Sequence, residues 1–156
     1  MNTTDTTPKA IFQQTSILYL ALLAGQVLFS LVVLWLLYSG SMNVGMEESV
    51  FVYLIPVLSI SAIFGAYILQ NRRNAAAAFL DDLDEKVQHY RQTIITCGAI
   101  LEGANLLAII AALLTGQMYY LLYFAIGLGA FVLLRPSIDK FKKMYRLSLQ
   151  EAADMQ

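Results

Sequence analysis

Charged residues are scarce in this sequence: they make up 13% of its 156 positions, whereas an ordinary soluble domain has about a quarter. The charges nearly balance, with 10 lysines and arginines against 11 aspartates and glutamates, so no basic surface for nucleic acid is expected. One cysteine and one histidine exclude an internal disulfide and a zinc-type metal framework. Hydrophobic residues fill 58% of the chain and its mean hydropathy is +0.62, a composition that predicts an integral membrane protein.

The motifs of the common catalytic sites are missing as well. The sequence contains no nucleophile–base pair, no metal-ligand cluster and no phosphate-binding loop. Gly25, Gly98 and Gly103 lie inside apolar segments and do not form a phosphate motif. Cys97 also lies in an apolar segment, where a free cysteine behaves as a small buried residue. We therefore predict a non-catalytic protein without a cofactor.

Four apolar segments dominate the chain, at about 16–38, 50–70, 93–114 and 119–134. A transmembrane helix needs about 20 mostly apolar residues, so the fourth segment, at about sixteen, lies near the lower limit. We predict an all-α fold, an integral membrane four-helix bundle over residues 16–134. Residues 1–15 are polar and are expected to be a flexible tail. The apolar segment after them is too long for a signal peptide, so we expect an uncleaved first span.

Two polar segments are predicted to add helical extensions on the cytoplasmic side. Alanines and apolar residues at helical spacing over 71–90 indicate that the second helix leaves the membrane, turns near 81–84 and re-enters as the third. Residues 135–156 are expected to form an amphipathic helix that lies on the membrane surface or packs along the bundle. On the membrane surface, its basic residues would contact anionic lipid: Lys140, Lys142, Lys143 and Arg146.

The basic residues have a one-sided distribution. All 10 fall at Lys9, between Arg72 and Arg91, or between Arg135 and Arg146, and the connections 39–49 and 115–118 contain none. With four spans, the three basic segments lie on one side of the membrane and the two connections without them on the other, which is the positive-inside pattern. We therefore expect a multi-pass protein of the plasma (inner) membrane with both termini in the cytoplasm.

The first and third apolar segments resemble each other when the sequence is shifted by 78 residues. Within residues 12–25, six positions have identical counterparts in the second copy: Gln14, Thr15, Ile17, Ala21, Leu23 and Gly25. We infer an internal repeat of two tandem helical hairpins, related by an approximate two-fold axis along the membrane normal. Chance similarity between apolar segments is the alternative. Glu102 corresponds to Ala24, so the carboxylate belongs to one copy only.

Glu102 is the candidate functional residue, because it places a carboxylate near the middle of the third apolar segment. Asn105 lies one helical turn further on, and Gln26 and Ser30 are polar residues of the first segment. We expect these four residues to form an intramembrane polar site, with Glu102 as a neutral acid hydrogen-bonded to Gln26 or Asn105. Glu102 would serve as a structural interhelical contact, as a proton- or cation-binding group, or as a contact to a lipid or small ligand.

The stretch Ala99–Ala108 resembles the carboxylate-bearing helix of the proteolipid, or c-type, subunits of rotary ATPases. The resemblance implies that Glu102 is an ion-binding carboxylate. The chain departs from that family in lacking its glycine-repeat helix, in carrying the carboxylate on the first helix of a hairpin, and in having no basic residue in the loops within hairpins. As a whole it looks more like the small, uncharacterised four-span membrane proteins of bacteria.

Two functions are compatible with these patterns. The first is a non-catalytic membrane bundle that oligomerises or scaffolds partners through residues 72–90 and 136–156. The second is a proton or cation pathway built on Glu102, which would need an oligomer because four spans line no wide pore. The partners expected from the sequence are the lipid bilayer, further copies of the chain and anionic lipid.

Overall fold

The computed structural model describes residues 7–40, 50–77, 80, 82–145 and 147, and these residues contain helices and no strand, as predicted. The helices are α1 (Pro8–Tyr38), α2 (Phe51–Ala76), α3 (Leu83–Thr115), α4 (Tyr120–Leu133) and α5 (Ile138–Met144). In the described part of the chain, 3 helices, α1 to α3, are long and apolar enough to cross a membrane. The shorter α4 and α5 meet that criterion only together, as a pair bent by 66°.

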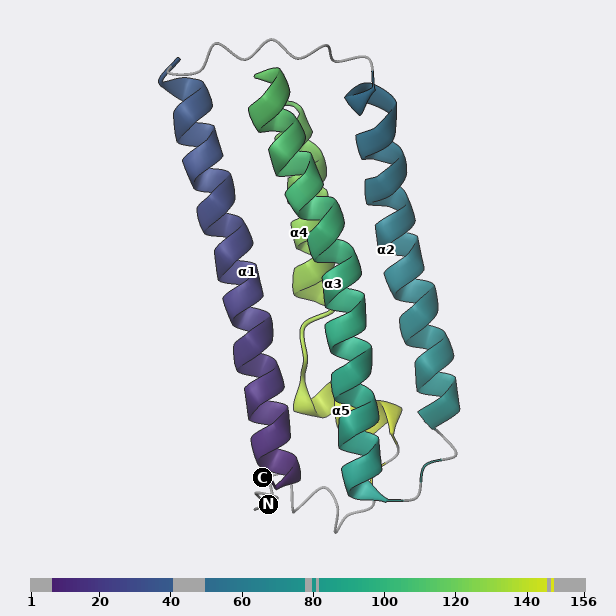
Figure 1. The fold of residues 1–156 in the computed structure, drawn as a ribbon. Coiled ribbons are helices and arrows are strands. Elements are labelled where there is room, and N and C mark those ends of the chain that lie inside the picture. Colours follow the sequence, from purple (N-terminus) through teal and green to yellow (C-terminus); the bar gives the residue numbers. More distant parts are fainter. Residues whose placement is uncertain (1–6, 41–49, 78–79, 81, 146, 148–156) are drawn as a thin grey trace, which may run out of the picture.

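The helix α3 is the centre of the bundle (Figure 1). It packs against α1, α2 and α4, with α1 and α2 on opposite sides of it and α4 behind it. The chain runs up α1 and α3 and down α2 and α4, so α1 and α3 are parallel. Since α3 separates α1 from α2, these two helices pack on α3 rather than closely on each other.

The helices α1 and α3 keep a nearly constant offset in residue number along their shared interface. The Phe12 and Tyr90 rings stack with centroids 5.8 Å apart, and these residues are also aligned by the shift of 78. Higher up, a hydrogen bond joins residues 26 and 105, which are 79 positions apart. The two aligned segments therefore lie side by side in nearly the same register as in the sequence comparison.

The first helix begins earlier than the sequence predicts. Pro8 is its first residue, a position where the missing N–H and fixed φ of proline suit a helix start. Ile11, Phe12 and Thr15 are buried, so this end of α1 packs on the bundle. Residues 8–15 are therefore helical rather than part of a flexible tail, and residues 1–6 lie outside the described part of the chain.

The connection between α2 and α3 agrees with the predicted helical extensions. The second helix continues past residue 70 to Ala76, and α3 begins at Leu83, well before residue 93. At its other end α3 stops at Gly116, whose φ of 74° is left-handed and whose N–H donates to the carbonyl of Ala112. Glycine adopts this conformation without a Cβ penalty, which allows the tight turn into α4.

The last described helix is shorter than the helix predicted over 135–156. It has 7 residues, and its Phe141 is fully buried, as is most of Tyr145 just after it. These two aromatic residues pack on α1 and α3, so α5 contacts its own bundle, which was one of the two expected positions. Residues 146 and 148–156, which include Arg146, lie outside the described part of the chain.

Candidate functional site

Gln26 on α1 and Asn105 on α3 form a buried hydrogen bond in the body of the bundle. The Nδ2 atom of Asn105 donates to Oε1 of Gln26 over 2.8 Å. The two residues are 1% and 2% exposed. The structure thus brings together two of the four residues predicted as the polar site. Because an unpaired buried amide is costly, this bond favours one register of α1 on α3.

A glycine on α4 completes the surroundings of Asn105. A Cβ atom added to Gly127 would overlap Oδ1 of Asn105 and lie 3.0 Å from its Cγ. The asparagine side chain therefore occupies the space that any other residue at position 127 would need. We call Gln26, Asn105 and Gly127 the polar triad; it links α1, α3 and α4 at one level.

The polar triad is not completely satisfied. The Nε2 atom of Gln26 is buried and has no hydrogen-bond partner among the residues that the structure describes. Leaving such a donor unpaired costs about 1–3 kcal/mol. The triad therefore specifies how the helices fit together more than it adds to their stability.

Glu102 does not join the polar triad. It is half-buried, and its carboxylate makes no hydrogen bond or ion pair with any described residue. Three residues of an α-helix turn by about 300°, so Glu102 points about 60° away from Asn105 around the α3 axis. The predicted bond from Glu102 to Gln26 or Asn105 is therefore not formed, because the rotation places the carboxylate at the flank of α3.

Ser30 also stays outside the triad. Its Oγ atom donates to the carbonyl of Val27 over 2.8 Å, within its own helix. Serine hydroxyls in apolar helices commonly bond back to a carbonyl of the preceding turn, since no water competes for them. Ser30 therefore satisfies itself locally and makes no contact with another helix through this group.

A second interhelical contact was not predicted from the sequence. Tyr19 on α1 donates its hydroxyl proton to the carbonyl of Phe131 on α4 over 2.6 Å, and the two rings stack with centroids 4.2 Å apart. The Tyr19 ring passes over Gly98 of α3, where an added Cβ would lie 3.3 Å from it. A tyrosine in the middle of an apolar segment was the available signal, since its hydroxyl must find an acceptor.

The lower end of the bundle holds an aromatic cluster, formed by Phe12, Tyr90, Phe141 and Tyr145. Neighbouring rings in it have centroids between 4.8 and 6.2 Å apart. The Tyr145 hydroxyl also lies 2.8 Å from Nδ1 of His89, the one histidine of the chain. This cluster and its histidine attach α5 to α1 and α3.

His89 and Tyr145 lie below the expected span 93–114, and the pKa values of both groups are shifted. Burial, and then the positive charge of Arg73, lower the pKa of His89. Burial raises the pKa of Tyr145, so its phenol stays protonated at neutral pH. A neutral imidazole can therefore accept the phenolic proton at Nδ1.

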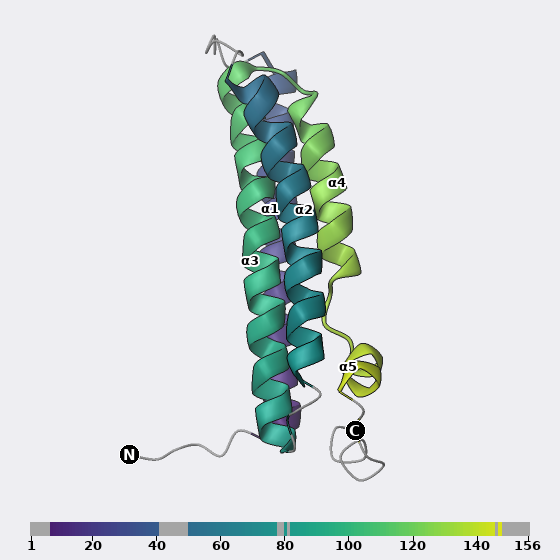
Figure 2. The same cartoon turned by 90° about the vertical axis from the view of Figure 1, so that its right-hand side faces the viewer.

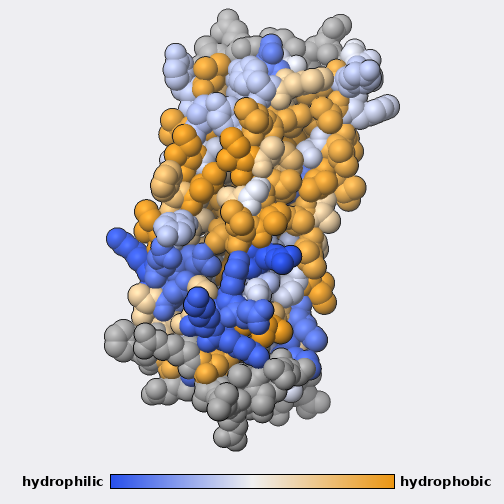
Figure 3. Space-filling view, turned by 180° about the vertical axis from the view of Figure 1, so that it is seen from behind, coloured by the Kyte–Doolittle hydropathy of each residue, from blue (hydrophilic) through white to orange (hydrophobic). Residues whose placement is uncertain are grey.

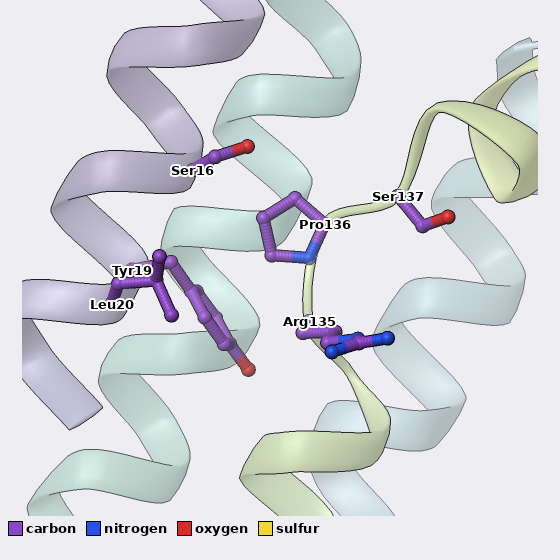
Figure 4. A pocket seen from close by; sticks show the side chains of 6 residues that line it. All are labelled: Ser16, Tyr19, Leu20, Arg135, Pro136 and Ser137. Carbon is purple, nitrogen blue, oxygen red and sulfur yellow. The ribbon is translucent and has the colours of Figure 1, made fainter.

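The chain bends sharply between α4 and α5, and a cavity opens beside this bend. It has a volume of about 210 Å³ and is lined by Ser16, Tyr19, Leu20, Arg135, Pro136 and Ser137. Figure 4 shows the Ser16 side chain pointing from α1 toward Pro136, with the Arg135 guanidinium on the side of the connection away from Tyr19. The cavity is therefore bounded by one helix and by the backbone of the bend.

No group of three or more histidine, cysteine, aspartate or glutamate residues in the described ranges could hold a metal ion. Comparisons with known proteins give no match: no protein-family model, no curated protein and no solved structure matches this chain. The residues and contacts described above therefore carry the functional argument.

Proposed function

We propose that this protein is a four-span protein of the bacterial inner membrane with both termini in the cytoplasm. In this topology α4 is a short fourth span and α5 lies at the cytoplasmic surface. The distribution of basic residues supports it, because those that the structure describes belong to the start of α1, the end of α2, the first part of α3 and the segment from Arg135 through α5, all at the same end of the bundle. Figure 3 supports it as well: on the face with α4 and α5, hydrophobic residues fill the upper part and hydrophilic ones the lower part.

The proposal includes the origin of the bundle as two tandem helical hairpins, α1–α2 and α3–α4. The parallel alignment of α1 and α3, with an offset close to that of the sequence repeat, supports this origin. The second copy then became the centre of the bundle, and it alone carries a carboxylate, Glu102, where the first copy has Ala24.

We infer a non-catalytic role that depends on assembly into an oligomer. The observation that carries this inference is the position of Glu102: half-buried on the flank of α3, within a candidate span, and with no partner in the described part of its own chain. Ionisable groups at this depth are costly unless they pair. A hydrogen-bonding group from a second copy would provide that partner.

The surroundings of Glu102 allow a second helix to come close. Ala99 and Gly103 are exposed on α3, and nothing lies within 4 Å of a Cβ added to Gly103. Small residues at a membrane helix surface permit close helix approach, and polar side chains then bond across the contact. The oligomer contact is therefore proposed along this part of α3.

The test is the oligomeric state in native lipid, measured by mass photometry after extraction in polymer nanodiscs. Glu102→Ala should shift the population toward the monomer, whereas Glu102→Gln, which keeps the hydrogen-bonding capacity, should retain most of the oligomer. Gln13→Ala is the control, since Gln13 is an exposed polar residue of α1, whereas the exposed Ser61 of α2 lines a groove together with Gly103. An unchanged oligomer mass in Glu102→Ala would contradict the proposal.

The alternative function is a proton or cation pathway in which Glu102 binds the ion. The same unpaired carboxylate favours it, as does the resemblance of Ala99–Ala108 to the ion-binding helix of c-type subunits. Proteoliposome flux assays with Glu102→Gln separate the two functions, because this variant loses the charge and keeps the hydrogen bond. Loss of flux with retained assembly would support the pathway, and equal flux would remove its basis.

The cytoplasmic segments are proposed as contact regions for lipid and partners. Lys142 and Lys143 of α5 would contact anionic lipid, together with Arg146, which lies outside the described residues. Lys140 has a further role, because its Nζ donates to the carbonyl of Leu133 over 2.6 Å. It thereby satisfies one of the carbonyl groups left open at the end of α4.

A further inference from the structure

The short length of α4 places the residue after it at an unusual depth. With 14 residues, α4 is about 21 Å long, whereas the apolar part of α3, over 93–114, is about 33 Å long. The apolar part of α3 ends just before the turn at Gly116, and α4 begins just after it. Figure 2 shows the result: α4 ends well above the lower ends of α1, α2 and α3, and α5 lies beneath it.

Two hydrogen bonds fix the level of the bend between α4 and α5. Tyr19 bonds to the carbonyl of Phe131 before the bend, and the Ser137 N–H donates to the Tyr90 hydroxyl over 3.2 Å after it. Arg135 is thereby held near the Ser16–Leu20 part of α1. In that part Ile17 and Leu20 are 67% and 60% exposed, as expected for residues that face lipid tails.

Arg135 is therefore a cation at the level of lipid-facing apolar residues. It is exposed, and its guanidinium makes no ion pair or hydrogen bond with the described residues. Lys140 differs, because the Leu133 carbonyl already accepts its proton. An arginine at the edge of the hydrocarbon layer is costly without a counter-ion, and a phosphate is an anion that the bilayer itself supplies.

The space beside Arg135 suits the acyl chain of a phospholipid. The Arg135 guanidinium lies on the side of the connection away from Tyr19, and so away from the cavity of about 210 Å³ that Tyr19 lines. On the other flank of the bend, α2 and α4 border a mainly apolar groove of about 330 Å³. It is lined by Ile63, Tyr67, Gln70, Ala130, Leu133 and Leu134.

We propose that Arg135 binds the phosphodiester of a phospholipid from the cytoplasmic leaflet, with an acyl chain of that lipid along the α2–α4 groove. The planar guanidinium donates two parallel N–H groups to a phosphate, which a lysine does not reproduce. The assignment to the cytoplasmic leaflet depends on the proposed topology, whereas the binding of the phosphodiester by Arg135 does not. Because the phosphodiester is the recognised group, both phosphatidylethanolamine and phosphatidylglycerol bind.

The experiment is native mass spectrometry of the purified full chain, titrated with each of these two lipids. Arg135→Gln is expected to weaken binding of the tightest lipid at least fivefold for both headgroups, and Arg135→Lys to weaken it less. Lys143→Gln is the control, since Lys143 is an exposed cation of α5, and it should change only phosphatidylglycerol binding. Equal binding by Arg135→Gln and the parent protein overturns the proposal.

A second variant tests the groove without changing any charge. Leu133 lines the groove and is 75% exposed, so Leu133→Trp narrows the groove and leaves the core intact. It is expected to weaken lipid binding at least threefold, with the thermal unfolding temperature as a check on folding. Inorganic phosphate serves as the competing probe: displacement of the lipid by millimolar phosphate would overturn the proposal by showing an anion site without lipid recognition. The lipid-binding result does not depend on the outcome of the oligomer test with Glu102→Ala.

Discussion

Asn105 and Gly127 fit together in such a way that the side chain of one fills the space left by the missing side chain of the other. A Cβ at position 127 would overlap Oδ1 of Asn105, and the amide nitrogen of Asn105 is already bonded to Gln26. The asparagine therefore has no room to move aside without breaking that bond. This relationship makes the spacing of α4 on α3 depend on one polar side chain.

Gly127→Ala should destabilise the protein by about 1–3 kcal/mol, the usual cost of adding atoms to a packed site. The measurement is the free energy of unfolding in detergent micelles, from denaturant titration followed by circular dichroism. Gly129→Ala is the matched control on the same helix, since nothing lies within 4 Å of a Cβ at Gly129. Adding Asn105→Ala to Gly127→Ala should recover part of the loss, and a purely additive double variant would show that the two residues are not in conflict.

The Gln26–Asn105 hydrogen bond should have a measurable but modest coupling energy. Interhelical hydrogen bonds in membranes average about 0.6 kcal/mol in double-mutant cycles, with a maximum near 1.7. We expect a value in this range from Gln26→Ala, Asn105→Ala and their combination. The cycle of Ser30→Ala with Asn105→Ala serves as a reference and should give no coupling, because Ser30 bonds within α1. Equal coupling energies in both cycles would mean that the coupling does not arise from the Gln26–Asn105 hydrogen bond.

The Asn105–Gly127 and Gln26–Asn105 contacts also show which features of the bundle could be predicted from the sequence. Gln26 and Asn105 were predicted as members of one polar site with Glu102 and Ser30, because polar residues in apolar segments need partners. The exclusion of Glu102 was not predictable in the same way. In a membrane, apolar residues suit both the lipid-facing and the buried sides of a helix, so hydropathy does not reveal which flank of α3 is covered.

The position of α3 between α1 and α2 could not be predicted for the same reason, since hydropathy does not reveal which helix faces are covered. The repeat predicted two tandem helical hairpins, and it did not predict that α3 lies between α1 and α2. What decides this arrangement is steric fit at positions such as Gly98, which the Tyr19 ring crosses, and Gly127, which faces Asn105. Glycines are common in membrane helices, so neither could be identified as a contact point before its partner was known.

His89 should titrate with a pKa below its usual value of about 6.5, because burial and the Arg73 charge both disfavour the imidazolium. The unfolded chain then binds more protons than the folded one as the pH falls below about 6.5, so acidification destabilises the folded state. This loss of stability begins near the pKa of His89 in the unfolded chain and is complete once the pH is below its pKa in the folded chain. Above about pH 7.5 the stabilising contribution of neutral His89 is fully present.

The chain has one histidine, so the imidazole resonance in NMR spectra reports this pKa without ambiguity. Arg73→Gln should raise the pKa of His89, whereas Arg72→Gln, at the neighbouring exposed position, should change it less. In His89→Phe, the difference in unfolding temperature between pH 7.5 and pH 5 should become smaller than in the parent protein. A His89 pKa above 6.5 would contradict the burial argument.

Phe141 should control the attachment of α5 to the bundle. It is fully buried and contacts the rings of Phe12, Tyr90 and Tyr145. Truncation of a buried phenylalanine to alanine costs about 3–5 kcal/mol, and here that cost falls on the local contact between α5 and the other helices. Phe141→Ala should therefore populate a state in which α5 is detached while α1 to α4 stay folded.

Trypsin measures that state directly, because α5 contains Lys140, Lys142 and Lys143, and a protease cuts a helical segment only after that segment unfolds locally. Phe141→Ala should be cut in α5 at least tenfold faster than the parent protein, with its helical circular dichroism nearly unchanged. Ile138→Ala is the matched control, since Ile138 is 37% exposed on the same helix and should alter the rate less than twofold. Equal cleavage rates for the two variants would show that α5 is held by its connection to α4 rather than by the aromatic cluster. The pH dependence of the cleavage rate separates these two modes of attachment further, because only attachment through the Tyr145–His89 contact weakens on acidification.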